Sequence, residues 1–286
     1  MNDDQGAASH VHAASTGQPL TGAGWLDVHF EACRPEYEAM LCSVGLQPGW
    51  RVLDAGCGSG SYLPLIAEAV GPTGSLVALD LAEDNVATVL DRASSWQLPA
   101  PLEVRAGDVA ALPFPNDRFD AVWCAATAQY LADDELAAAL AEFRRVVRPG
   151  GLVALKDYDA TLPRFLPAPV NSFTHFYEAG ARSGVAQYRG ALRTPSLGMW
   201  LRRAGLADVR MRTTLVERSA PLRPAERQFW GDLLAYFAPL ASRHALSAED
   251  RALWDRLTDP AERERLLDDP AFYCCEGHVV AVGTVL

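Results

Sequence analysis

Three glycines at alternate positions are the residues of this chain best suited to bind a small ligand. They are Gly56, Gly58 and Gly60, and they follow an apolar run in the stretch RVLDAGCGSG, residues 51–60. Glycine has no Cβ atom, so the backbone approaches a ligand closely and adopts positive φ. If a helix follows, its first N–H groups and its dipole attract polar or charged ligand groups. The stretch therefore predicts a ligand cradle.

The spacing of the glycines argues against a pyrophosphate ligand. The dinucleotide pattern G-x-G-x-x-G needs a third glycine where this chain has Ser61. The phosphate loop of nucleotide hydrolases needs Gly-Lys-Ser/Thr, which is absent. A G-x-G-x-G loop suits a ligand with a small charged end and no pyrophosphate.

Two aspartates further along the chain indicate recognition of a nucleoside. Asp80 ends the apolar stretch SLVALD, about 20 residues after the loop, where a carboxylate accepts hydrogen bonds from both ribose hydroxyls. Each such bond contributes about 1.5–3 kcal/mol because the acceptor is charged. Asp108, beside Val109, would accept from an exocyclic amine while apolar neighbours sandwich an adenine. The alternative is a helix N-cap for each aspartate and a tight turn for each glycine.

Alternating strands and helices over residues 51–157 would bring these residues together. Continuous apolar strands separated by helices predict a parallel sheet that is covered on both faces, and right-handed crossovers make it doubly wound. The strands are expected at 51–55, 75–80, 102–108, 119–126 and 151–157, and the helices at 61–70, 83–96 and 133–151.

The helix at 83–96 has a distinct apolar face. Asp84 is its predicted N-cap, and Val86, Val89, Leu90 and Ala93 are its predicted core residues. The helix at 133–151 is predicted from acids in its first turn, arginines in its last turn and a Pro-Gly stop.

The rest of the chain is less regular. Residues 158–194 contain three prolines and an aromatic group, which comprises Phe165, Phe173, Phe176, Tyr177 and Tyr188. Further expected elements are helices within 25–46, at 196–206 and within 224–268, and strands at 207–217 and 278–286. If the last two strands pair, the residues between them form an insertion at one sheet edge. The aromatic residues line an apolar acceptor site under a lid or form the core of the added helices.

Composition excludes several classes of function. Hydrophobic residues make up 49% of the chain, enough for a large core, yet no apolar run reaches the roughly 18 residues of a membrane helix. The net charge of −11 argues against nucleic-acid binding. Residues 1–20 are polar, without the features of a secretory signal, and we expect a disordered tail.

The cysteines predict a reducing compartment, the cytoplasm. The six are scattered and show neither C-x-x-C nor Cys/His metal spacing, so no metal site is expected. The adjacent pair Cys274–Cys275 would bind a soft metal or simply enter a buried strand, and we favour the strand.

Four stretches in order resemble the motifs of class I S-adenosylmethionine-dependent methyltransferases. They are VLDAGCGSG, LDLAEDNV, AGDVAALPFPNDRFDAVWC and RVVRPGGLVAL. The resemblance is to the small-molecule branch similar to the ubiquinone/menaquinone-biosynthesis methyltransferases, and it covers residues 50–157. It implies a Rossmann-like α/β fold, a doubly wound, mostly parallel seven-stranded sheet with helical lid insertions, and S-adenosyl-L-methionine as cofactor.

The resemblance also implies roles for individual residues. The three glycines would line the methionine part of the cofactor, and Asp54 would help to hold its ammonium group. Asp80 would bind the ribose with Leu81 against the adenine, and Asp108 and Val109 would contact the adenine. Cys124 would face the cofactor from below, without acting as a nucleophile.

No catalytic base is evident from the sequence. Relatives often carry a histidine after the fourth strand, where this chain has ATAQYL. The remaining candidates are His175 in the expected lid, Tyr158 after the fifth strand and His29 in the leading helix. A histidine that is neutral near pH 7 suits deprotonation of a hydroxyl group. A lone histidine in an aromatic stretch is also often structural, and carbon methylation of an acidic acceptor needs no base.

These observations lead to one predicted function with alternatives. We expect residues 21–286 to form a methyltransferase domain with a core at 47–157 and lid insertions at about 158–194 and 224–268. The expected activity is methyl transfer to a small molecule, first as O-methylation of an apolar natural product. The alternatives are C- or N-methylation, a non-transfer reaction such as cyclisation, a nicotinamide oxidoreductase and a non-enzymatic interaction protein. Expected partners are the small-molecule substrate, with neither nucleic acid nor membrane, and the oligomeric state stays open, a homodimer included.

Overall fold

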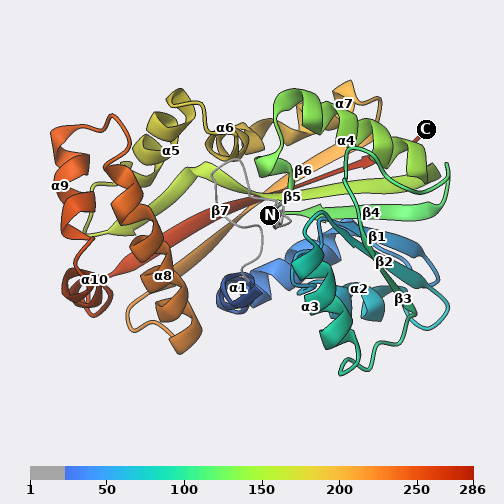
Figure 1. The fold of residues 1–286 in the computed structure, drawn as a ribbon, viewed down its shortest axis with the longest axis horizontal. Coiled ribbons are helices and arrows are strands. Elements are labelled where there is room, and N and C mark those ends of the chain that lie inside the picture. The colour runs from blue at the N-terminus through green and yellow to red at the C-terminus, as the bar shows by residue number, and fades with distance from the viewer. Residues whose placement is uncertain (1–22) are drawn as a thin grey trace, which may run out of the picture.

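A seven-stranded sheet forms the centre of the computed structural model, which describes residues 23–286 (Figure 1). The predicted tail, residues 1–20, lies outside the described residues. Within them the strand order is β3-β2-β1-β4-β5-β7-β6. The strands are β1 (Arg51–Ala55), β2 (Ser75–Asp80), β3 (Leu102–Ala106), β4 (Phe119–Ala125), β5 (Val147–Leu166), β6 (Ala207–Ser219) and β7 (Tyr273–Thr284).

The sheet is mostly parallel, as the sequence predicts. Strands β3, β2, β1, β4 and β5 pair in parallel, whereas β7 runs antiparallel to both β5 and β6. The strand at 207–217 therefore pairs with the last strand, so the residues between them form an insertion at this edge of the sheet. This order brings the carboxyl ends of β1, β2, β4 and β5 to one edge of the sheet, where ligands bind in open α/β folds.

Helices cover both faces of the sheet. The described residues contain α1 (Ala23–Val44), α2 (Leu63–Val70), α3 (Glu83–Ala93), α4 (Asp133–Val146), α5 (Ser172–Arg182), α6 (Ala186–Arg193), α7 (Leu197–Arg203), α8 (Pro224–Ala241), α9 (Ala248–Arg256) and α10 (Pro260–Leu267). Helices α1, α2 and α3 share a core with Val52 and Trp123, and α4 and α7 share one with Leu53 and Val122. Neighbouring strand residues thus serve opposite faces, as the strand period of two requires. None of the described helices is both long and apolar enough to cross a bilayer.

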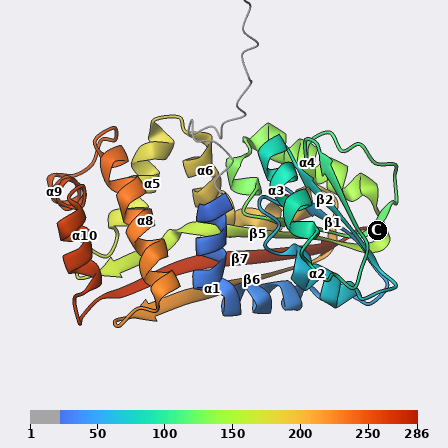
Figure 2. The same cartoon turned by 60° about the horizontal axis from the view of Figure 1, so that its bottom comes forward.

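Strand β5 is much longer than its prediction. Instead of ending at residue 157 it continues to Leu166, because β7 pairs with it as far as Tyr273. A register shift between Asp159 and Arg164 interrupts this pairing. Figure 2 shows that the extension of β5, β6 and β7 is covered by α5, α8, α9 and α10.

The aromatic residues of the predicted lid form the core of this extension. Phe165, Phe173, Phe176, Tyr177 and Tyr188 are all buried. They pack with aromatic residues of α8 and α9, namely Trp230, Phe237 and Trp254. The sequence left two roles open for these side chains, lining an acceptor site or forming the core of the added helices. The structure shows that they form this core.

Three details of the helices differ from prediction. Ala82, not Asp84, is the N-cap of α3, and its N–H donates to Asp80 Oδ1 at 2.9 Å. Leu90, expected in the core, is 55% exposed because the helix turns it toward solvent. Helix α4 ends at Val146, before the Pro-Gly pair, because β5 pairing begins at residue 147.

Candidate active site

The tips of β1 and β2 are joined by backbone hydrogen bonds of the glycine-rich loop. The N–H groups of Gly56 and Cys57 both donate to the Leu79 carbonyl, at 2.7 and 3.0 Å. The N–H of Gly58 donates to Asp80 Oδ2 at 2.8 Å. The loop is thus folded against the strand whose last residue is Asp80, and the predicted ligand groups lie side by side.

Glycine is required at the start of this loop. Gly56 has φ +78°, and a Cβ atom at this position would clash with the side chain of Thr127. The Thr127 hydroxyl donates to the Gly56 carbonyl at 3.2 Å, so the segment after β4 lies directly against the loop. Any larger residue here would force β1 and β4 tips apart.

Asp80 connects the loop to the start of α3. Besides the Gly58 N–H, its carboxylate accepts from Ala82 N–H at 2.9 Å and from Asn85 Nδ2 at 3.0 Å. The contact with Ala82 matches the capping alternative for this residue. An ionised carboxylate has about four acceptor positions, so about one stays open to a ligand hydroxyl. Leu81, beside it, is 42% exposed at the rim.

Asp54 is an acid buried on the same sheet edge. It is 3% exposed, and burial, followed by repulsion from Asp80, raises its pKa to about 8. A cationic group bound beside it would offset both effects, because it favours the charged carboxylate. The site is therefore suited to a positively charged ligand end.

The remaining predicted cofactor residues fall into exposed and buried groups. The Asp108 carboxylate is exposed and accepts from Ala110 N–H at 2.8 Å, whereas Val109 is buried in the core. Cys124 is 1% exposed, and burial raises the pKa of its thiol far above the ordinary value. This agrees with the expectation that Cys124 is no nucleophile. The ligand contacts of all three stay predictions.

The first turn of α1 lies against the glycine-rich loop, a contact that the sequence analysis misses. Asp27 accepts from Arg92 Nη1 at 2.8 Å and from Ser59 Oγ at 3.0 Å. Burial alone would raise the pKa of Asp27, but these hydrogen bonds hold it below its usual value. Leu26 reaches within 3.0 Å of the position that a Cβ atom on Gly58 would take. Helix α1 thus covers the loop.

The structure separates the candidate catalytic residues. His175 on α5 is hydrogen-bonded through Nδ1 to Asp250 Oδ2 of α9 at 2.9 Å, at the end of the molecule away from α2 and α3 (Figure 1). Tyr158, predicted to follow the fifth strand, lies within the longer β5, with its ring near those of Tyr177 and His278. Burial raises the pKa of Tyr158 well above its ordinary value. Both catalytic roles stay predictions.

Next to Tyr158 lies a buried polar cluster that the sequence analysis did not find. Tyr37 OH lies 2.8 Å from His29 Nε2 and 3.4 Å from His278 Nε2, and the Lys156 ammonium group lies 3.6 Å from the centre of the Tyr37 ring. Glu276 is 3% exposed and contacts both histidines. Two signals in the sequence point to parts of this cluster. His29 and Cys33 are four residues apart in a predicted helix, and Glu276 and His278 are two residues apart at the start of a predicted strand.

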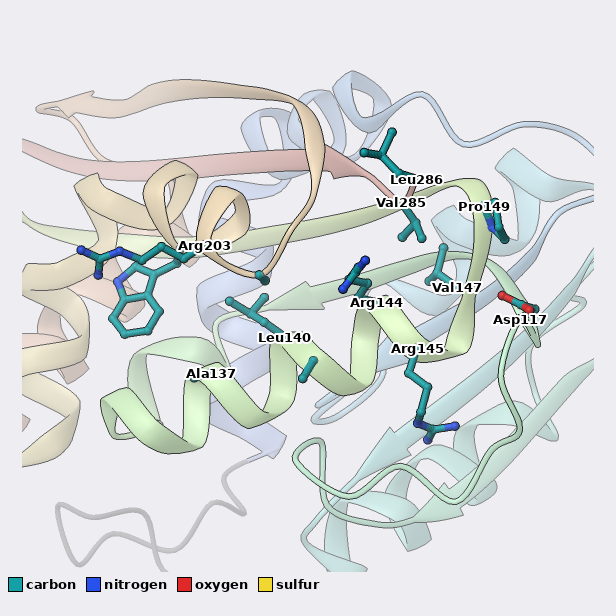
Figure 3. A pocket seen from close by; sticks show the side chains of 13 residues that line it. Asp117, Ala137, Leu140, Arg144, Arg145, Val147, Pro149, Arg203, Val285 and Leu286 are labelled. Carbon is teal, nitrogen blue, oxygen red and sulfur yellow. The ribbon is translucent and has the colours of Figure 1, made fainter.

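A surface groove of about 630 Å³ lies at the other edge of the sheet (Figure 3). It lies between α4 and α7 and is lined by Arg144, Arg203 and Val147, the residue at which β5 begins. Because it is at the amino end of the parallel strands, it is separate from the glycine-rich loop.

Comparison with known proteins identifies the part of the chain that holds this site. A protein family described as methyltransferase domain matches residues 52–151. Nocamycin O-methyltransferase of Saccharothrix syringae is 38% identical over 125 residues, which are 44% of this chain and 44% of that protein. Demethylmenaquinone methyltransferase of Staphylococcus aureus is 30% identical over 139 residues, 48% of this chain and 56% of that protein. The chain thus spans about half the length of these relatives.

Solved structures share the fold over most of the chain. Phosphoethanolamine N-methyltransferase 2 of Haemonchus contortus, in complex with S-adenosyl-L-methionine, has a TM-score of 0.51 at 15% identity, over 86% of this chain and 51% of that one. The YcgJ protein of Bacillus subtilis has a TM-score of 0.51 at 17% identity, over 87% and 97%.

Proposed function

Because residues 52–151 match the methyltransferase domain family, we propose that the chain transfers a methyl group from S-adenosylmethionine to a small-molecule acceptor. The main support for the proposal is the 2.8 Å hydrogen bond from the Gly58 N–H to Asp80, which holds the glycine-rich loop against this carboxylate. The glycine-rich loop, the Asp80 carboxylate and the buried Asp54 thus lie at one edge of the sheet, where Asp80 would accept from the ribose. These are the groups that the predicted cofactor requires.

The residues at this edge fit the cofactor chemically. Asp54 would bind its ammonium group, because opposite charge offsets the cost of a buried carboxylate. Asp80 would accept a hydrogen bond from one ribose hydroxyl at its remaining acceptor position. To accept from the second hydroxyl as well, it would have to lose one of its three present protein donors. Leu81, Asp108 and Val109 would contact the adenine, and Gly56, Gly58 and Gly60 the methionine part.

S-adenosylmethionine supplies an activated methyl group and its leaving group when it is bound. The chain must therefore align the acceptor with that group and exclude water. Alignment of bound reactants corresponds to effective molarities of about 10⁵–10⁸ M. Helix α1 contributes by covering the loop through Asp27 and Leu26. The lid role of residues 158–194 and 224–268 belongs to this proposal.

For the acceptor we propose a hydroxyl group of an apolar natural product. The similarity to nocamycin O-methyltransferase supports this choice. Tyr158, protonated at neutral pH, would donate a hydrogen bond that orients the acceptor. His175 would act as base only if a rearrangement frees it from Asp250. The six free cysteines support a reducing compartment such as the cytoplasm.

Calorimetry with S-adenosylhomocysteine tests the cofactor site. We expect saturable binding by the wild-type chain and about 10- to 150-fold weaker binding by Asp80→Asn, because one charged hydrogen bond contributes about 1.5–3 kcal/mol. Asp84→Asn, an exposed change in the first turn of α3, should bind like wild type. Asp108→Asn is a second variant of the proposed site. Because Asp108 is exposed, this change should disturb folding less than Asp80→Asn does. Absence of binding by folded wild-type protein would refute the proposal.

Turnover then distinguishes methyl transfer from other reactions at the same site. With a panel of hydroxylated apolar acceptors, S-adenosylhomocysteine should form only when an acceptor is present. Mass spectrometry of the product shows whether oxygen, nitrogen or carbon carries the methyl group. A converted acceptor without S-adenosylhomocysteine would favour a cyclisation instead.

A further inference from the structure

Four side chains with metal-binding chemistry converge between α1 and β7. They are His29 and Cys33 of α1 and Glu276 and His278 of β7, here called the α1–β7 cluster. One potential ligand atom from each lies within 4.8 Å of those of the other three. The cluster shares no residue with the glycine-rich loop.

Secondary structure places these four residues on facing surfaces. His29 and Cys33 are four residues apart, so they lie on one side of α1. Glu276 and His278 are two residues apart, so they lie on one face of β7. Arg218 of β6 fixes the helix against the sheet, since it donates to the Ala32 carbonyl at 2.9 Å. The two pairs therefore face each other as a consequence of the fold.

The three distances from the Glu276 carboxylate to the other ligand atoms match a tetrahedral metal site. Glu276 Oε2 lies 3.6 Å from His29 Nε2, 3.8 Å from His278 Nε2 and 3.8 Å from Cys33 Sγ. Zinc bonds of 2.0–2.3 Å in tetrahedral geometry separate ligand atoms by about 3.3–3.8 Å. The ligand atoms around this carboxylate oxygen thus need little movement to bind an ion.

Burial and charge also favour a bound cation. Cys33, Glu276 and His278 are 1, 3 and 0% exposed. A thiolate from Cys33 and the Glu276 carboxylate would together balance the charge of a divalent ion. His29 keeps 23% of its side chain exposed, which provides access from solvent.

We propose that the α1–β7 cluster binds one divalent transition-metal ion, with Zn²⁺ as the best match. Two imidazoles, a thiolate and a carboxylate are a ligand set that zinc prefers, and its tetrahedral spacing suits this ion. On binding, Cys33 releases its thiol proton to solvent and the sulfur forms the metal bond. The ion would tie α1 to β7.

Two neighbouring groups must adjust when the ion binds. Tyr37 OH now contacts Nε2 of both histidines, and it gives up these hydrogen bonds when the nitrogens bind the metal. Lys156 lies over the Tyr37 ring, and its charge opposes a nearby cation. Because two anionic ligands neutralise a divalent ion, the bound cluster is neutral, and Lys156 loses only the single negative charge of Glu276.

Cobalt spectroscopy on the full chain tests the proposal. Protein treated with a chelator and then titrated with Co²⁺ should show tetrahedral visible bands and a thiolate-to-cobalt charge-transfer band that saturate at one ion per chain. Zn²⁺ should displace the cobalt and abolish the bands. Cys33→Ser should lose the charge-transfer band, whereas Cys42→Ser, an exposed cysteine of the same helix, should keep it.

Further variants keep the test independent of folding. His29→Gln changes the most exposed ligand and should weaken Co²⁺ binding at least tenfold while the circular dichroism spectrum is unchanged. Absence of the charge-transfer band in wild-type protein, or its persistence in Cys33→Ser, would overturn the proposal. No cofactor or acceptor takes part, so failure here is separate from failure of the proposed methyl transfer.

Discussion

A buried carboxylate without a cationic partner in the protein is expected where a bound ligand supplies the positive charge. Asp54 has a pKa of about 8 because burial and Asp80 disfavour its charge. Such a residue lowers the stability of the ligand-free protein at neutral pH. This cost is expected of a binding residue and unexpected of a purely structural one.

The pH dependence of stability should show this cost for Asp54→Asn. Asp54 keeps its proton in the folded state up to about pH 8 but loses it near pH 4 when unfolded, so the ligand-free wild type loses stability as pH rises through this window. The variant should therefore melt at a higher temperature than wild type at pH 8, with little difference near pH 4. Thermal denaturation at several pH values measures this.

The same variant should bind S-adenosylhomocysteine more weakly, because the amide no longer attracts an ammonium group. A variant that is more stable and binds less identifies a binding residue. Equal melting temperatures across the pH range would show that Asp54 is not held at this raised pKa.

At the scale of elements, α1 connects the glycine-rich loop to the edge of the sheet. It contacts the glycine-rich loop through Asp27 and the edge strand β6 through Arg218, which donates to both Glu36 oxygens at 2.8 Å. Only 14% of the Arg218 side chain is exposed. This ion pair therefore holds the helix more firmly than a surface pair would.

Arg218→Met should loosen this attachment. We expect a loss of about 1.5–3 kcal/mol in the free energy of unfolding, because hydrogen bonds to a partly buried carboxylate are broken while the apolar stem is kept. Arg182→Met, which removes an exposed ion pair with Glu178, should change it by less than about 0.5 kcal/mol. Urea titration measures both, and equal effects would contradict the prediction.

The sequence predicts elements whose signals are local. Strands β1 and β2 and the glycine-rich loop are predictable because an apolar run, a turn and a helix follow within a few residues. The length of β5 is not, because its second half is a strand only through pairing with β7. The α1–β7 cluster is not predictable from the sequence for the same reason, because Cys33 and Glu276 are 243 positions apart. Asp84 has the right residue type for a cap, but Asp80 already binds the N–H of Ala82.

At the scale of the whole molecule, the extension of β5, β6 and β7 has its own aromatic core. Phe176 is 0% exposed, with ring centroids 5.0 Å from Phe237, 5.5 Å from Trp254 and 5.6 Å from Tyr188. These contacts join α5 to α6, α8 and α9. Packing, not sequence proximity, therefore holds the helices of the extension together.

Phe176→Ala should destabilise this core by about 3–5 kcal/mol, because it removes a buried ring and leaves a cavity. Leu90→Ala, at a 55% exposed position, should change stability by less than about 0.5 kcal/mol. Denaturant unfolding followed by tryptophan fluorescence measures both. A loss below 1 kcal/mol for Phe176→Ala would show that these helices repack around the gap.

The place of β7 in the sheet has a consequence for biosynthesis. It lies between β5 and β6 but is translated after both. On the ribosome, β6 therefore has no neighbour until residues 273–284 emerge, and the nascent chain exposes the unpaired edges of β5 and β6. Such edges attract other chains, so a pause in translation after residue 219 would leave the growing polypeptide dependent on chaperones.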